Sequence, residues 1–153
     1  MAAVNTVPIY SKVADIQWTS TDSDSPTFTA GPLKTAVTGK DGTAAGALVL
    51  FTADATNGGR VDRISSRAVG TNTASVLRVF INNGSTAATI ANNTLITEVT
   101  LPATALSEVA ALADVTISGT PFPLVLPPGY RLLVTIGTTV TAGIRVTAYG
   151  GRY

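Results

Sequence analysis

The chain has 153 residues, a length typical of one domain, and contains neither cysteine nor histidine. The missing cysteine excludes disulfides and thiolate metal sites, and the missing histidine removes the commonest general base and the commonest transition-metal ligand. We therefore predict a protein that is not an enzyme and that uses no metal and no cofactor. The net charge of +1, with scattered arginines, gives no basic patch for nucleic acid.

Charged side chains make up only 12% of the chain, against about 25% in an average soluble domain. One interpretation is a compact β protein with a threonine-rich face, because threonine suits a pleated surface. The other is a chain that works packed against other chains, where charges are costly to desolvate. Composition alone leaves both open. The strongest apolar run, Ala44–Phe51, is too short to span a membrane, so no membrane partner is expected.

The first predicted strand is "ADIQWTS", in which Ala14, Ile16 and Trp18 alternate with polar residues. We expect this apolar face, including Trp18, to lie in the core. Residues 19–44 are rich in turn formers and predict a long loop with one short strand near 35–38. The apolar run Ala47–Ala53 then predicts a strand that is buried on both faces.

The next segment opens with a turn at Asn57–Arg60. The strand after it places Val61 and Ile64 three residues apart, which indicates a β-bulge. Ser75–Asn82 is the clearest strand, and its Phe80 is expected in the core.

The sequence Asn83-Gly84 predicts a tight hairpin turn, from which "TAATIAN" would return. Another strand follows at Thr94–Leu101. The segment Pro102–Asp114 fits either a single helical turn or an extended connector.

Short strands follow in "DVTIS" and "FPLVL", where Pro121 and Pro123 indicate a sheet edge or an irregular start of the strand. The chain ends with "YRLLVTI" and "GIRVTAY", which we expect to form a last hairpin. Their predicted core positions are Tyr130, Leu132, Val134, Ile136, Ile144, Val146 and Ala148.

Together these patterns give about eight short strands with turn signals between them and no convincing long helix. They predict an all-β protein, an antiparallel β-sandwich or jelly roll. The predicted division is an N-terminal arm over residues 1–12 and a single β-sandwich domain over residues 13–153.

Two functional alternatives follow from the residues themselves. Tryptophan and tyrosine could stack on a sugar, which keeps a carbohydrate-binding module open. Paired carboxylates of a hydrolase would need distant strands to bring two of the scattered acids together.

The C-terminal half contains "TEVTLPATALSEVA", "PLVLPPGYRLLVTI" and "RVTAYGGRY". These stretches resemble small virion proteins of tailed bacteriophages, in which an "E-x-x-LPAT-x-LS" segment and an "LP-x-GY-x-L" corner precede a terminal "GG-x-Y". Here the matching positions are Glu98–Ser107, Leu126–Leu132 and Ala148–Tyr153.

The resemblance implies a jelly-roll decoration or cement protein on the capsid surface of the virion. It further implies the major capsid protein as partner, a homotrimer as the assembly state and no catalytic residues. A carbohydrate- or receptor-binding module on a head or tail fibre is the alternative. The candidate subunit contacts lie in the apolar arm and at the C-terminus: Val4, Val7, Pro8, Tyr10, Tyr149, Arg152 and Tyr153.

Overall fold

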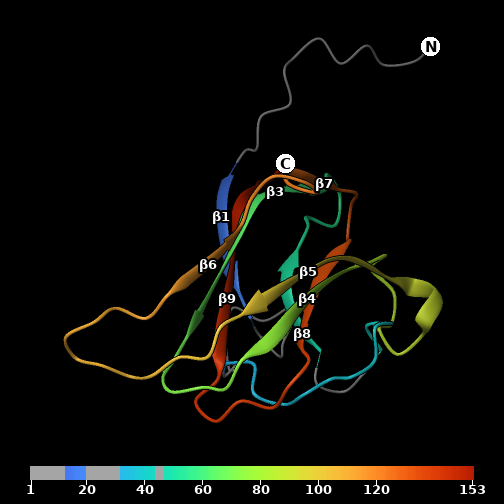
Figure 1. Cartoon of the computed structure of the whole chain (residues 1–153). Coiled ribbons are helices and arrows are strands. Elements are labelled where there is room, and N and C mark those ends of the chain that lie inside the picture. The colour runs from blue at the N-terminus through green and yellow to red at the C-terminus, as the bar shows by residue number, and fades with distance from the viewer. Residues whose placement is uncertain (1–12, 20–31, 44–46) are drawn as a thin grey trace, which may run out of the picture.

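The structure is a computed structural model that describes residues 13–19, 32–43 and 47–153 (Figure 1). Across these residues, nine strands form two antiparallel sheets. The first sheet has the order β1 (Val13–Trp18), β9 (Ile144–Arg152), β3 (Gly59–Ala68) and β6 (Asp114–Ile117), and β7 (Leu124–Leu126) also pairs with β3. The second sheet has the order β2 (Leu48–Thr52), β8 (Arg131–Ile136), β4 (Ser75–Asn82) and β5 (Asn93–Leu101).

The strand order confirms the predicted all-β sandwich and is that of a jelly roll. Most connections cross from one sheet to the other, so strands that follow one another in sequence face each other across the core. For example, β1, β3 and β6 lie in the first sheet, and β2, β4 and β5 lie in the second. The core lies between the sheets, where alternate residues of facing strands meet.

The core positions that period-two alternation predicted for the last two strands are confirmed. Leu132, Val134 and Ile136 are fully buried in β8, and Val146 and Ala148 are fully buried in β9. Tyr130 packs against the same cluster. The predicted bulge is also present, since the pairing of β3 with β9 shifts between Val61 and Arg63.

The expected last hairpin is wrong, because β8 and β9 lie in different sheets. Both edges of β8 are already occupied, by β2 on one side and β4 on the other. The chain therefore crosses the sandwich over residues 137–143, and β9 pairs with β1 and β3.

The prediction of a tight turn at Asn83-Gly84 is also wrong. Gly84 does adopt a left-handed φ of 87°, but β5 begins only at Asn93, after the 3-10 turn Ile90–Asn92. Side-chain amides hold this longer loop together: Asn82 Nδ2 donates to Asn93 Oδ1 at 2.8 Å, and Asn83 Nδ2 donates to Asn92 Oδ1 at 3.1 Å.

No strand forms near residues 35–38 in the described segment 32–43, which makes only isolated bridges, such as Ala36 with Ile136. This segment packs over the second sheet, where Gly42 lies against the Phe80 ring. Phe80 is fully buried as predicted, but it lies on the outer side of β4, beneath this segment. The segment 102–113 is an extended connector, without a helical turn, and it projects from the sandwich (Figure 1).

The first strand is placed as predicted, but the predicted burial of its faces is wrong. Ile16 is 54% exposed and Trp18 is only half-buried, so their shared face points away from the core. Gln17, on the opposite face, bonds to the backbone of Thr52 in the other sheet. Because β1 is an edge strand, its inner face meets the unpaired backbone of β2 rather than the apolar centre.

Candidate functional site

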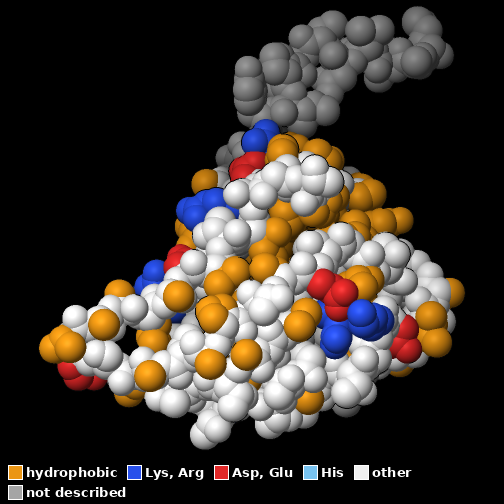
Figure 2. Space-filling view, viewed as in Figure 1, with side chains coloured by type: hydrophobic (Ala, Val, Ile, Leu, Met, Phe, Trp, Pro, Cys, Tyr) orange, Lys and Arg blue, Asp and Glu red, His pale blue; other side chains and the backbone are white. Residues whose placement is uncertain are grey.

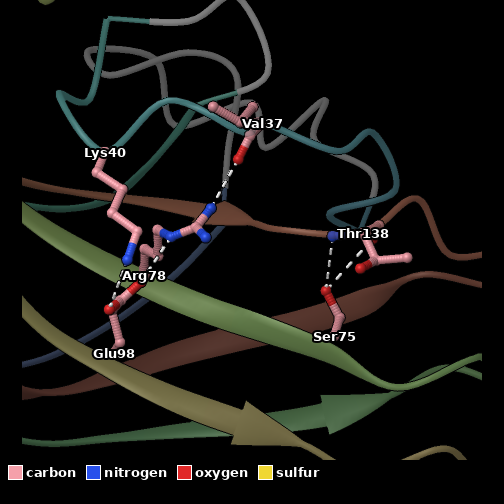
Figure 3. Close-up of polar contacts among 6 residues, drawn as sticks. All are labelled: Val37, Lys40, Ser75, Arg78, Glu98 and Thr138. Carbon is pink, nitrogen blue, oxygen red and sulfur yellow. Dashed lines mark hydrogen bonds and ion pairs between the residues drawn. The ribbon is translucent and has the colours of Figure 1, made fainter.

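The outer face of the second sheet is closed by the segment 32–43. Arg78 of β4 is only 9% exposed, and it donates from Nη1 to the carbonyl oxygen of Val37 at 2.8 Å (Figure 3). Its Nε lies 2.7 Å from Glu98 Oε1, and Lys40 Nζ lies 3.3 Å from Glu98 Oε2. Arg78 therefore links the covering segment to the sheet, a structural role for a buried charge.

The hydrogen bond from Arg78 is also the main reason that the pKa of Glu98 lies below its usual value of 4.5, and Lys40 adds to the effect. This carboxyl group is thus held in its charged form. The cluster of Lys40, Arg78 and Glu98 stabilises the fold, and its charged groups are paired with one another.

The outer face of the first sheet is different, because it is open to solvent in the described part of the chain. Alternation and register place the outward side chains of four strands side by side on this face. They are Ala14, Ile16 and Trp18 of β1, Tyr149, Thr147 and Arg145 of β9, Arg63, Ser65 and Arg67 of β3, and Asp114 and Thr116 of β6. We call this set the open face.

An open depression of about 410 Å³ lies in the open face, lined by Ser65, Arg67, Ala68, Val69, Asp114, Arg145, Thr147 and Tyr149. At its rim the Arg63 guanidinium carbon lies 3.9 Å from the centre of the Tyr149 ring. This cation–π contact fixes both side chains and leaves the arginine charge near the surface.

Within the depression, Asp114 accepts a hydrogen bond from Ser65 Oγ at 2.6 Å and lies 3.3 Å from Arg67 Nη2. Arg67 and Arg145 stand directly opposite each other on β3 and β9. Like charges in such cross-strand positions destabilise a sheet. Three arginines and one aspartate give the open face an excess positive charge of 3 − 1 = +2.

The second distinctive surface is the connector between β5 and β6, residues 102–113, which we call the projecting loop. Its base is fastened by the segment after β3: Asn72 and Thr104 exchange two backbone hydrogen bonds of 3.0 and 2.9 Å. Thr104 Oγ1 donates to the Gly70 carbonyl at 2.7 Å, and the Leu106 N–H donates to Thr71 Oγ1 at 3.0 Å. The loop is therefore held in a defined position.

The far part of the projecting loop is apolar and exposed. Val109 is 98% exposed and Leu106 is 60% exposed, while Ser107 Oγ accepts hydrogen bonds from the N–H groups of Val109 and Ala110. Figure 2 shows hydrophobic side chains gathered along this projection, with acidic side-chain atoms beside them. Leu106 and Val109 thus form an exposed apolar surface on a loop whose base is fixed.

Most carboxyl groups of the described residues have a partner within the chain. Asp15, Asp62, Glu98 and Asp114 have arginine partners, and Asp41 and Asp54 accept hydrogen bonds from nearby backbone N–H groups. Among the described carboxylates this leaves Glu108, on the projecting loop, without a hydrogen bond or ion pair. Arg145 on the open face is likewise without one among the described residues, as are Arg63, Arg131 and Lys34.

The structure brings only part of the predicted contact set together. Tyr149 lies on the open face, as described. Arg152 Nε pairs with Asp15 Oδ2 at 2.7 Å inside the first sheet, and the Tyr153 N–H donates to the Gly58 carbonyl at 3.3 Å. The four predicted arm residues Val4, Val7, Pro8 and Tyr10 lie outside the described residues.

Sequence reasoning missed the arginines of the open face and Glu108 of the projecting loop. Arg63, Arg67 and Arg145 looked scattered because the first two are on β3 and the third is far away on β9. The outward register of Arg145, Thr147 and Tyr149 in "GIRVTAY" was the available signal.

In the residues that the structure describes, no group of three or more acidic side chains is arranged to hold a metal ion. None of the helical segments described is long and apolar enough to cross a membrane. Comparison with protein-family models, with curated proteins and with solved structures finds no match for this chain.

Proposed function

We propose that this chain is a structural subunit of a tailed-bacteriophage particle, a decoration or cement protein that binds the major capsid protein on the capsid surface and assembles as a homotrimer. The observation that carries the proposal is the projecting loop, which is fastened at its base and holds Val109 98% exposed. A protein that works through contacts with neighbouring subunits needs such a preorganised apolar surface.

The resemblance to phage virion proteins supports the same proposal from another direction. Two of its three motifs lie mostly in connections between strands. The segment Glu98–Ser107 runs from the end of β5 into the projecting loop, and Leu126–Leu132 forms the corner between β7 and β8. The third, Ala148–Tyr153, ends the strand that contributes Tyr149 to the open face.

The direct test is binding of the purified chain to capsids that lack decoration protein. We expect the chain to sediment with these capsids at a fixed ratio to the major capsid protein, and to raise the temperature at which they break open. Capsids that already carry their decoration protein serve as the control and should not take up the chain. Absence of binding to undecorated capsids would contradict the proposal.

A carbohydrate-binding module is the second candidate, and the Arg63–Tyr149 pair favours it. An aromatic ring beside hydroxyl and carboxylate groups, here Ser65, Thr147 and Asp114, is a surface that could hold a sugar. This candidate predicts specific hits on a glycan array that disappear in Tyr149→Ala. The matched control is Tyr153→Ala, at a tyrosine outside the depression.

A further inference from the structure

We infer that the projecting loop of one copy of this chain seats on the open face of a second copy, with Glu108 directed to the arginines there and Val109 on the apolar part of the face. The inference rests on the proposed function in that it makes the loop an assembly contact, and it names the partner. The occupant of the open face is another molecule of the same chain.

Charge complementarity is the first reason. The loop carries one charged side chain, Glu108, and no described group pairs with it. The open face carries an excess of positive charge, and Arg145 stands unpaired opposite Arg67. A carboxylate placed between these two guanidinium groups would relieve their repulsion and form charge-assisted hydrogen bonds.

Apolar complementarity is the second reason. Leu106 and Val109 flank Glu108 in sequence and are largely exposed, and Val69, two residues after Arg67 in the lining of the depression, is 47% exposed. Burying these groups against one another would remove apolar surface from water at both sides of the contact. The depression of about 410 Å³ provides room for the loop's side chains.

The geometry of a single copy is the third reason. The loop leads into β6, the terminal strand on one edge of the first sheet, and it extends away from the sandwich there (Figure 1). Its base is fastened to residues 70–72, and Glu108 makes no ion pair with the described arginines of its own molecule. Loop and face are different surfaces, and a contact of this kind links copies head to tail and can close a ring.

The experiment is the mass of the purified chain in solution, measured by analytical ultracentrifugation without capsids. We expect a species larger than the 15.5 kDa monomer. Glu108→Arg and Arg145→Glu should each raise the dissociation constant of self-association about tenfold or more. The double variant with both changes restores the opposite charges and should recover most of the lost association.

Val109→Asp tests the apolar part in the same way, and Ile90→Asp is its matched control, since Ile90 is 63% exposed but lies on the loop before β5. Only the change at Val109 should dissociate the oligomer. All these positions are exposed, and circular dichroism checks that each variant is folded. Chains with Val109→Cys that are mixed with chains with Val69→Cys should form mixed disulfide dimers, because the chain has no cysteine of its own.

A chain that is monomeric at all concentrations would overturn the inference. So would an oligomer that none of the three single changes weakens, or a double charge variant no better than its parents. A glycan that binds the open face and is lost in Tyr149→Ala would assign this face to a sugar and would also overturn it. Capsid sedimentation decides the capsid-binding part of the proposed function separately, since it is measured on the wild-type chain whatever its mass.

Discussion

The side-chain amide of Gln17 lies against the backbone of Thr52 and replaces a missing strand neighbour. Its Oε1 accepts the Thr52 N–H at 2.8 Å, and its Nε2 donates to the Thr52 carbonyl oxygen at 3.1 Å. Gln17 belongs to β1 at the edge of the first sheet, and Thr52 belongs to β2 at the edge of the second. The side chain of one glutamine thus links the edge strands of the two sheets.

Replacing Gln17 by leucine should therefore lower the free energy of unfolding by about 1–3 kcal/mol, because both backbone groups of Thr52 lose their partner. Urea denaturation measures the change. Ile16→Ala is the control in the same strand, and since Ile16 is 54% exposed we expect a change within about 0.5 kcal/mol. Equal losses in the two variants would mean that Gln17 acts only as a strand residue.

Arg78 fastens the segment 32–43 to the second sheet, so Arg78→Ala should destabilise the protein by about 3 kcal/mol. The loss has two parts: the Val37 carbonyl loses its donor, and the space beneath Gly137 that the guanidinium fills is left empty. Thermal unfolding measures it, with the more exposed Arg60→Ala as control. A similar drop for both arginines would contradict the buried role of Arg78.

The free energy of unfolding should decrease at acidic pH, because three carboxyl groups have lowered pKa values in the folded state. The pKa values of Glu98, Asp41 and Asp54 are lowered by hydrogen bonds, chiefly from Arg78, from the Thr43 N–H and from the Asn57 N–H. Because each folded-state pKa lies below the unfolded one, the stabilisation is present above the usual values of 4.5 and 3.8 and is lost as the pH falls through the folded values.

Urea midpoints measured from neutral pH into the acid range should therefore stay level and then decrease below about pH 4.5. Glu98→Gln should remove part of this decrease, since it removes one of the three groups. Asp62→Asn, at an exposed carboxyl group whose partner is the exposed Arg60, is the control. Stability that increases toward acid pH would contradict the assignment.

Removal of residues 150–153 should lower the stability of the fold as well as any assembly. The sequence predicted Arg152 and Tyr153 as contacts to a neighbouring subunit, but Gly150, Gly151 and Arg152 pair with both β1 and β3. Loss of these pairs and of the Arg152–Asp15 ion pair should appear as a lower melting temperature. Removal of Tyr153 alone, which keeps the strand, is the control and should have a much smaller effect.

Asn72 is expected to control the order of the projecting loop. Its side chain donates to the Gly143 carbonyl at 2.8 Å and accepts from the Ala142 N–H at 2.8 Å, which fixes the segment that holds Thr104. Asn72→Ala should accelerate amide hydrogen exchange at Thr104 and Leu106. Asn57→Ala, in an exposed turn, should leave exchange in the loop unchanged.

The strands and their core faces were largely predictable because alternation is a local property of the chain. "SVLRVFIN" matches β4 residue for residue, and the alternating positions of β8 and β9 are buried as expected. Pairing is not local. The last two strands look like a hairpin in sequence, yet they separate because β8 already has two neighbours.

The same distinction applies to the candidate site. The exposure of Leu106 and Val109 was not evident, because "PATALSEVAALAD" was compatible with a helical turn that would bury one side. The positive charge of the open face depends on the register that sets Arg67 opposite Arg145. Neither feature can be found by looking for a motif.

The sequence by itself determined the β-rich class, the alternation of most strands and the residue types available for chemistry. Tertiary structure decided which side of β1 meets the core, since Gln17 is needed to satisfy the unpaired backbone of Thr52 and turns Ile16 and Trp18 outward. It also decided where the arginines gather. Side-chain alternation is set by each strand's own backbone, whereas the partner of a strand depends on which edges the rest of the chain has left free.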